Sequence, residues 1–216
     1  MMLRTALLAL ALAAVPFAAQ AEPALAIPPP AAEAPAQGTG LETAVLAGGC
    51  FWGIQAVYQH VSGVKNAVSG YAGGAQKDAY YQTVSSGRTT HAEAVQITFD
   101  PKQISYGKIL QIYFSVAHDP TQLNRQGWDI GDQYRSAIFF HDAEQQEAAT
   151  RSKAEEQTRH RGQVVTQIEP AQTFYEAEDY HQQYLEKRGR SSCTPALRQA
   201  ASAPACPGAR CSFLRR

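Results

Sequence analysis

The chain has 216 residues, and its 19 Lys or Arg residues balance 19 Asp or Glu residues, so the formal net charge is zero. This balance provides no basic field to hold a phosphate backbone, which counts against nucleic-acid binding. A hydrophobic share of 44% excludes a chain that is disordered throughout, and four cysteines are too few for a disulfide scaffold. The length fits one soluble domain with an additional segment at each end.

Residues 1–21 have the three-part pattern of a secretory signal peptide. Arg4 precedes an apolar run over residues 6–15, and Ala19 and Ala21 are small residues at the spacing that a signal peptidase recognises. The apolar run is shorter than the roughly 20 residues that a membrane-spanning helix needs. We therefore predict cleavage after Ala21 and export, which in a bacterium leads to the periplasm. The alternative is an Ala-rich extension that is not removed.

Composition divides the rest of the chain into three parts. Residues 22–40 hold five prolines and six alanines, which predicts an extended linker. Apolar and polar runs alternate from Leu41 onward, so we place the folded domain at residues 41–187. Residues 188–216 contain six arginines, no acidic residue and three of the four cysteines, which is typical of a basic tail rather than a packed element.

Periodicity and turn residues predict the elements of the domain. Strands and helices are interleaved, which indicates an α/β or α+β domain with a mixed sheet. Two long segments, 73–88 and 118–134, have no regular pattern, and loops of that length are usually functional. We expect Asp142 to cap the longest helix. The expected strands are 43–47, 64–71, 93–99, 135–140 and 164–168, and the expected helices are 51–60, 106–116, 142–160 and 176–187.

Cys50 is the first candidate for chemistry, because it lies between a predicted strand and a predicted helix. The first amides of a helix lack internal partners and carry partial positive charge, which favours the thiolate, and the thiolate is the nucleophile. Glycines on either side leave room for a substrate, and Phe51 and Trp52 offer apolar walls. Taken alone, Cys50 also fits a buried structural thiol.

One carboxyl and two phenols are further candidates. Glu93 begins an otherwise apolar strand, where a carboxyl is either capped by a partner or kept protonated by desolvation. A protonated carboxyl can donate to a developing oxyanion. A surface carboxylate at a strand end is the alternative. Tyr81 and Tyr134 fall in the two long loops, and Asp129 lies shortly before Tyr134. Each tyrosine alone fits half-buried packing as well as catalysis.

Eight motifs in order, spread over residues 43–187, resemble the peptide methionine sulfoxide reductase A family. Such a resemblance implies an α/β (α+β) roll, with a mixed sheet flanked by helices, and reduction of the S epimer of methionine sulfoxide, free or in proteins. The motifs are Gly-Cys-Phe-Trp-Gly (49–53), Gly-Tyr-Ala-Gly-Gly (70–74), His-Ala-Glu-Ala-Val (91–95), Phe-Asp-Pro (99–101), His-Asp-Pro (118–120), Asn-Arg-Gln-Gly (124–127), Gly-Asp-Gln-Tyr-Arg-Ser (131–136) and Ala-Glu-Asp-Tyr-His-Gln-Gln-Tyr-Leu (177–185).

The resemblance also implies a role for individual residues by position. These roles agree with elementary chemistry, since a sulfoxide sulfur becomes electrophilic only when its oxygen is protonated or strongly hydrogen-bonded. The implied roles are Cys50 as nucleophile, Glu93 as proton donor, Tyr81 and Tyr134 as phenols that hold the oxygen, Phe51 and Trp52 as the pocket for the substrate methyl, and Asp129 as a carboxylate that positions the substrate.

The tail departs from the family pattern, because the Gly-rich run around the recycling cysteines is missing. Cys193 lies at about the expected distance from the last motif and is assigned the first recycling role, resolving a sulfenic acid on Cys50 to a disulfide. Cys206 or Cys211 then passes the disulfide to an external thioredoxin-like donor. Cys206 and Cys211 are also close enough in sequence to pair with each other and take no part.

No metal site, bound cofactor or stable membrane insertion is expected, and we expect a monomer. The six histidines lack the spacing of a zinc site. His181 matches the family and fits either support of the active-site wall or simple packing. Two other classes remain open: a Cys-dependent hydrolase or acyl transferase with Cys50 as nucleophile, and a non-catalytic methionine-binding module.

Overall fold

The structure is a computed structural model that describes residues 40–189. The predicted signal peptide, nearly all of the predicted linker, and Cys193, Cys206 and Cys211 lie outside the described residues. Within residues 40–189, no helix is long and apolar enough to cross a membrane.

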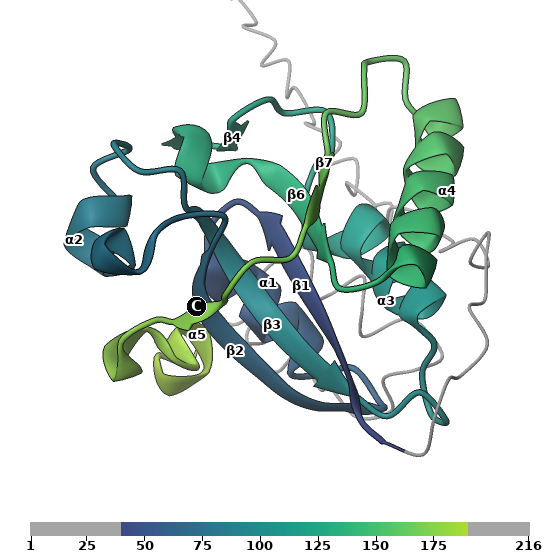
Figure 1. Cartoon of the computed structure of the whole chain (residues 1–216), viewed down its shortest axis with the longest axis horizontal. Coiled ribbons are helices and arrows are strands. Elements are labelled where there is room, and N and C mark those ends of the chain that lie inside the picture. The colour runs from purple at the N-terminus through teal and green to yellow at the C-terminus, as the bar shows by residue number, and fades with distance from the viewer. Residues whose placement is uncertain (1–39, 190–216) are drawn as a thin grey trace, which may run out of the picture.

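A six-stranded mixed sheet forms the centre of the described region, in the order β7-β6-β1-β3-β2-β8 (Figure 1). The strands pair antiparallel except β6 and β7, which run parallel. β1 and β3 are the two central strands, and most residues of both are buried. Their bounds are β1 Glu42–Gly48, β2 Val64–Ala72, β3 Ala92–Phe99, β6 Ser136–Phe140, β7 Gln167–Pro170 and β8 Tyr175–Glu176.

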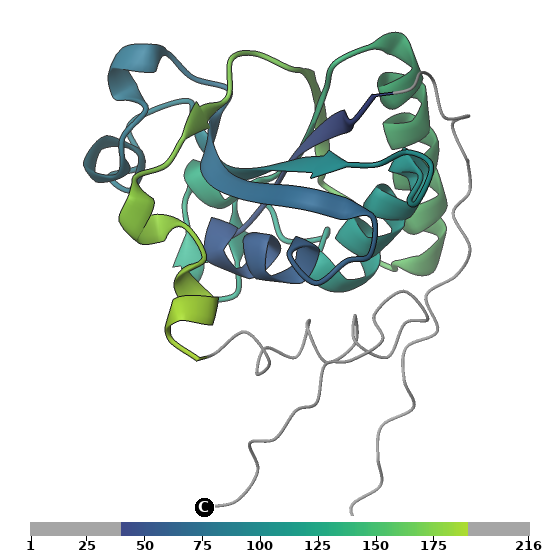
Figure 2. The same cartoon turned by 90° about the horizontal axis from the view of Figure 1, so that it is seen from below.

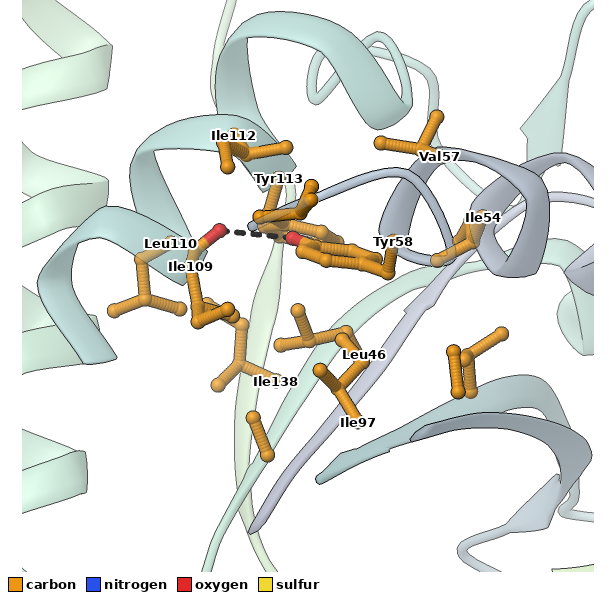
Figure 3. Close-up of a cluster of buried hydrophobic side chains, with 14 of the residues drawn as sticks. Leu46, Ile54, Val57, Tyr58, Ile97, Ile109, Leu110, Ile112, Tyr113 and Ile138 are labelled. Atoms are coloured by element: carbon orange, nitrogen blue, oxygen red, sulfur yellow. Dashed lines mark hydrogen bonds between the residues drawn. The ribbon is translucent and has the colours of Figure 1, made fainter. Parts of the chain in front are cut away.

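The main helices pack on one face of this sheet, and Figure 2 shows α1 and α3 beneath it. Their apolar residues and those of the strands form one large core. Figure 3 shows Tyr58 inside this core, where its hydroxyl donates to the carbonyl of Ile109 at 2.8 Å. A smaller cluster of alanines, Val45 and Phe139 covers the other face. The helices are α1 Phe51–Tyr58, α2 Tyr81–Val84, α3 Tyr106–Ile112, α4 Ala143–Arg159 and α5 Tyr184–Lys187.

The second long loop contains a short hairpin, formed by β4 (Arg125–Gln126) and β5 (Asp129–Ile130). This hairpin, α2 and α5 gather at the end of the domain that lies opposite α4 (Figure 1). The predicted mixed sheet flanked by helices is confirmed, and with it most of the predicted elements.

The prediction of one final helix over residues 176–187 is wrong. The segment begins as edge strand β8 and ends with α5, and a single 3-10 turn over Asp179–His181 lies between them. Two residues interrupt any helix: Gln182 is extended, and Gln183 has a left-handed φ of 55°. The side chain of Gln182 explains the interruption, because it bonds both the N–H and the carbonyl of Ser69 in β2 at 3.0 and 2.8 Å.

The predicted strand 164–168 begins three residues late, at Gln167. The preceding residues bond elsewhere: the N–H of Val164 donates to the side chain of Gln157, and that of Val165 to the carbonyl of Pro120. The predicted helix 106–116 is present, but after Ile112 it widens into a π-helical turn over Tyr113–Ala117. The late start of β7 thus arises from bonds to other segments that periodicity does not reveal.

The Asp142 cap yields a test of stability. Asp142 Oδ1 accepts from the N–H of Gln145 at 2.8 Å, as predicted from the sequence. Asp142→Ala should lower the free energy of unfolding by about 1 kcal/mol, because it leaves a helix-terminal amide without an acceptor. Urea unfolding measures this loss. Glu147→Ala, which removes an exposed pair with Arg151 on the same helix, should change it by less than about 0.5 kcal/mol, and equal losses would contradict the capping role.

Candidate active site

Cys50 lies at the junction where β1 ends and α1 begins, as its sequence position predicted. Gly49 just before it has a φ of +92°, and a Cβ there would lie 2.5 Å from the Cβ of Gln126. A glycine is therefore required for two reasons, the left-handed backbone and the close approach of the β4–β5 hairpin. The hairpin and the β1–α1 junction together hold Cys50 at the edge of the core, where its side chain is half-buried.

Glu93 reaches this junction from the neighbouring strand. Its side chain is 2% exposed, and its Oε2 accepts a hydrogen bond from the N–H of Phe51 at 3.1 Å. The pKa of Glu93 is raised to about 7, mainly by burial and to a lesser extent by the charge of Asp129, while the hydrogen bond from the Phe51 amide acts in the opposite direction. Near neutral pH, Glu93 therefore holds its proton about half of the time. The prediction that desolvation keeps this carboxyl protonated agrees with this shift.

The amides at the helix terminus act on Cys50 in the predicted direction, but they do not decide its protonation state. Burial and the charge of Glu93 raise the pKa of Cys50 to about 12, although the amides of Trp52 and Gly53 act in the opposite direction. The helix terminus does stabilise the thiolate, but desolvation is the larger effect. Without a substrate, Cys50 is a thiol at neutral pH.

Tyr81 and Tyr134 lie on short elements inside the two long loops. Tyr81 begins α2, and Tyr134 ends a 3-10 turn over Asp132–Tyr134. Burial, followed by the charge of Glu93, raises the pKa of both phenols. Both therefore remain protonated donors. Their electrostatic coupling to Glu93 and Cys50 places them at the same site.

Phe51 and Trp52 form an aromatic wall beside Cys50, together with residues near the end of the described chain. Trp52 stacks on Tyr184, with ring centroids 3.7 Å apart, and its Nε1–H donates to Nδ1 of His181 at 3.1 Å. This bond leaves the proton of a neutral His181 on Nε2, and burial lowers the pKa of His181, which favours the neutral ring. The ring of His181 also lies 5.1 Å from that of Phe51. His181 thus supports the aromatic wall.

Asp129 lies on the exposed hairpin strand β5, between Trp128 and Ile130. Its charge raises the pKa of Glu93, Cys50 and both site phenols, so its carboxylate lies within electrostatic range of this site. The structure therefore brings together all seven predicted site residues that it describes. Within residues 40–189, no three His, Cys, Asp or Glu side chains are arranged as metal ligands.

Sequence analysis missed two groups that support the site. Glu178 accepts from the backbone N–H of Tyr81 at 3.0 Å, although the two residues are 97 positions apart. His118 is half-buried against Gly48 at the end of β1 and shares a 2.7 Å hydrogen bond with the hydroxyl of Ser136. Both lie in motifs that were quoted for the family resemblance, but no local pattern shows which distant atoms they contact.

Comparisons with known proteins agree with this geometry. A family model described as peptide methionine sulfoxide reductase matches residues 42–204. The chain belongs to the peptide methionine sulfoxide reductase family. MsrA 2 of Mesorhizobium japonicum is 55% identical over 148 residues, which are 68% of this chain and 76% of that protein. MsrA of Methanothermobacter thermautotrophicus is 51% identical over 154 residues, 70% of this chain and 90% of that protein.

Solved structures show the same fold. Mxr1 of Saccharomyces cerevisiae in reduced form has a TM-score of 0.67 at 34% identity, and the match covers 72% of this chain and 90% of that one. Methionine sulfoxide reductase A of Corynebacterium diphtheriae has a TM-score of 0.62 at 34% identity, covering 71% and 77%. The predicted fold and the predicted enzyme, an oxidoreductase that reduces methionine sulfoxide with thiols, are confirmed. Neither the hydrolase nor the binding module is supported.

The raised pKa of Glu93 predicts how its replacement changes stability with pH. A folded-state pKa near 7, above the ordinary value of 4.5, means that folding favours the protonated carboxyl. The stability contributed by Glu93 is therefore complete below pH 4.5 and is lost as the pH rises through 7. Glu93→Gln cannot ionise and escapes this loss, so its free energy of unfolding relative to the unmodified protein should rise by about 3 kcal/mol between pH 4.5 and 8.

Urea unfolding at a series of pH values measures this difference. Comparison with the unmodified protein at each pH cancels the contributions of the other titrating groups. A difference that stays constant with pH, or that becomes smaller as the pH rises, would contradict the buried protonated carboxyl.

Proposed function

We propose that Cys50 and Glu93 together reduce methionine S-sulfoxide, free or in proteins, to methionine. The observation that carries the proposal is the buried Glu93 carboxyl at the N-terminus of α1, with its pKa raised to about 7 beside the Cys50 thiol. When Glu93 is protonated beside the Cys50 thiol, the pair presents no charge to an uncharged sulfoxide. The same carboxyl holds the proton that the sulfoxide oxygen needs.

The reaction transfers the sulfoxide oxygen to the sulfur of Cys50. The sulfur of Cys50 bonds to the sulfoxide sulfur and loses its own proton, while Glu93 transfers a proton to the sulfoxide oxygen. The hydroxyl group then moves from the substrate sulfur to Cys50, which releases methionine and leaves a sulfenic acid. The proton lost by Cys50 restores the carboxyl of Glu93. The net change is transfer of one oxygen atom from methionine sulfoxide to the cysteine.

The other site residues bind and orient the substrate. Tyr81 and Tyr134, which stay protonated, donate to the sulfoxide oxygen as negative charge develops on it. Phe51 and Trp52 receive the terminal methyl, and Asp129 positions the polar part of the substrate. Stacking on Tyr184 and the bond to His181 hold the Trp52 ring in place for this contact.

The remaining steps restore the thiol. Cys193 condenses with the sulfenic acid on Cys50 to form a disulfide, and Cys206 or Cys211 exchanges onto it. A thioredoxin-like protein then reduces the disulfide, so that no bound cofactor is needed. This scheme rests on the sequence positions of the tail cysteines and on the membership of the family.

The N-terminal pattern carries a proposal about location. In this proposal the chain is cleaved after Ala21 and exported to a bacterial periplasm. There it acts as a monomer and repairs oxidised proteins outside the cytosol. Disulfides persist in such a compartment, so the thioredoxin-like donor has to be supplied with electrons there.

A stereochemical assay tests the proposed reaction. Residues 22–216, with excess dithiothreitol and a peptide that carries racemic methionine sulfoxide, should consume the S epimer alone, as resolved on a chiral column. Cys50→Ser should remove this activity, because a hydroxyl is far less nucleophilic toward sulfur. Consumption of neither epimer by folded protein, or undiminished turnover by Cys50→Ser, would overturn the proposal.

Glu93→Gln tests the proton donor. The amide retains an oxygen that accepts from the Phe51 N–H but has no acidic proton, so kcat should fall by roughly 10²- to 10⁴-fold while KM changes little. Glu169→Gln is a matched control. Glu169 lies on β7, which is remote from Cys50 in the sheet order, and its carboxylate pairs with Arg135. Steady-state kinetics with dithiothreitol measure both variants. Unchanged turnover in Glu93→Gln would remove the role of Glu93.

A further inference from the structure

Tyr81 is held by a residue from the far end of the described chain. It is the first residue of the short helix α2, and the preceding residue, Tyr80, makes no side-chain cap. The carboxylate of Glu178 takes the place of a cap: its Oε1 accepts from the backbone N–H of Tyr81 at 3.0 Å. The helix terminus that carries a site phenol is thus completed by a long-range bond.

The second oxygen of this carboxylate anchors it to the sheet. Glu178 Oε2 accepts from the hydroxyl of Tyr71 at 2.9 Å, and Tyr71 lies directly opposite Glu93 in the pairing of β2 with β3. Burial acts to raise the pKa of Glu178, but hydrogen bonds from the Tyr81 amide, its own backbone N–H and the Tyr71 hydroxyl together lower it. Glu178 is therefore charged at neutral pH and accepts these bonds strongly. One carboxylate therefore joins α2 to the strand beside the proposed proton donor.

The backbone around Glu178 is fixed as well. The N–H of Ala177 donates to the carbonyl of Ser69 at 2.9 Å, and β8 pairs with β2 just before it. On the other side, the side chain of Gln182 bonds Ser69 and the carbonyl of Ala177. Glu178 thus reaches Tyr81 from a rigid base.

From this geometry we infer that Glu178 is a positioning residue for the sulfoxide-binding phenol of Tyr81. The inference rests on the proposed function, in which Tyr81 donates to the sulfoxide oxygen. Its backbone is fixed by Glu178, and its ring lies 4.4 Å from that of His181. The carboxylate acts through Tyr81 and does not itself contact the substrate.

Kinetics of matched variants test the inference. Glu178→Ala should lower kcat by about tenfold with little change in KM, because Tyr81 acts mainly on charge that develops in the transition state. Glu178→Gln should remain within about threefold of the unmodified protein, since its amide oxygen still accepts from the Tyr81 N–H and its amide group donates to the Tyr71 oxygen. Glu176→Ala, an exposed carboxylate on the same segment, is the control and should have no effect.

A double-mutant cycle separates positioning from general support. In a Tyr81→Phe background, which has already lost the phenol, Glu178→Ala should lower kcat by less than about threefold more. Tyr71→Phe removes only the other hydrogen bond and should leave Tyr81 in place. Effects of Glu178→Ala and Tyr81→Phe that multiply independently, or a loss in Glu176→Ala equal to that in Glu178→Ala, would overturn the inference.

An activity-independent measurement separates this inference from the proposed function. Amide hydrogen exchange at Tyr81, measured by NMR, should become at least about tenfold faster in Glu178→Ala and stay unchanged in Glu176→Ala. Unchanged exchange at Tyr81 would overturn the inference even if the unmodified protein is fully active. Faster exchange together with an unmodified protein that reduces no sulfoxide would support the clamp on Tyr81 and contradict the proposed reaction.

Discussion

The hydrogen bond from the Phe51 amide to the Glu93 carboxyl is the interaction on which the site depends. It joins the first turn of α1 to the central strand β3, so that the residue after the nucleophile is tied to the proposed proton donor. The bond forms only because β1 and β3 pair in a fixed antiparallel register, which brings the start of β3 beside the end of β1. The core that buries both strands then removes water from Glu93 and raises its pKa. The pairing of β1 with β3 thus determines both the position of Glu93 and its raised pKa.

Burial of Glu93 also lowers the stability of the folded state at neutral pH. A carboxyl that ionises near pH 7 inside the domain weakens the folded state at neutral pH, where an amide would not. A thiol with a pKa of about 12 similarly shows that the junction does not favour a charged Cys50 before a substrate arrives. Desolvation favours the neutral form of both groups. The site therefore favours uncharged reactive groups at the expense of stability, a pattern expected where function and folding make different demands.

Local patterns predicted much of this structure and failed where distant atoms decide the outcome. A buried apolar run predicted β1, and alternation of apolar residues predicted β2 and β3, all nearly to the residue, while Asp142 predicted the start of α4. The final helix failed because the side chain of Gln182 bonds the backbone of β2, which no periodicity in residues 176–187 indicates. The net protonation state of Cys50 could not be predicted for a related reason. Helix-terminal amides are visible in a sequence, whereas the burial that outweighs them becomes visible only once the sheet is formed.

Local context made the seven described site residues candidates and the family resemblance implied their roles, but the groups that orient them were not found. Cys50 and Glu93 stand out because glycines or apolar residues surround them, and that contrast is local. Glu178 lies in a polar segment where one more carboxylate is unremarkable, and its partner is 97 positions away. A reactive group has to be exposed to a substrate and therefore interrupts a local pattern. A positioning group needs only a distant partner, so it leaves no local signature, and the supporting contacts of such a site have to be read from the folded chain.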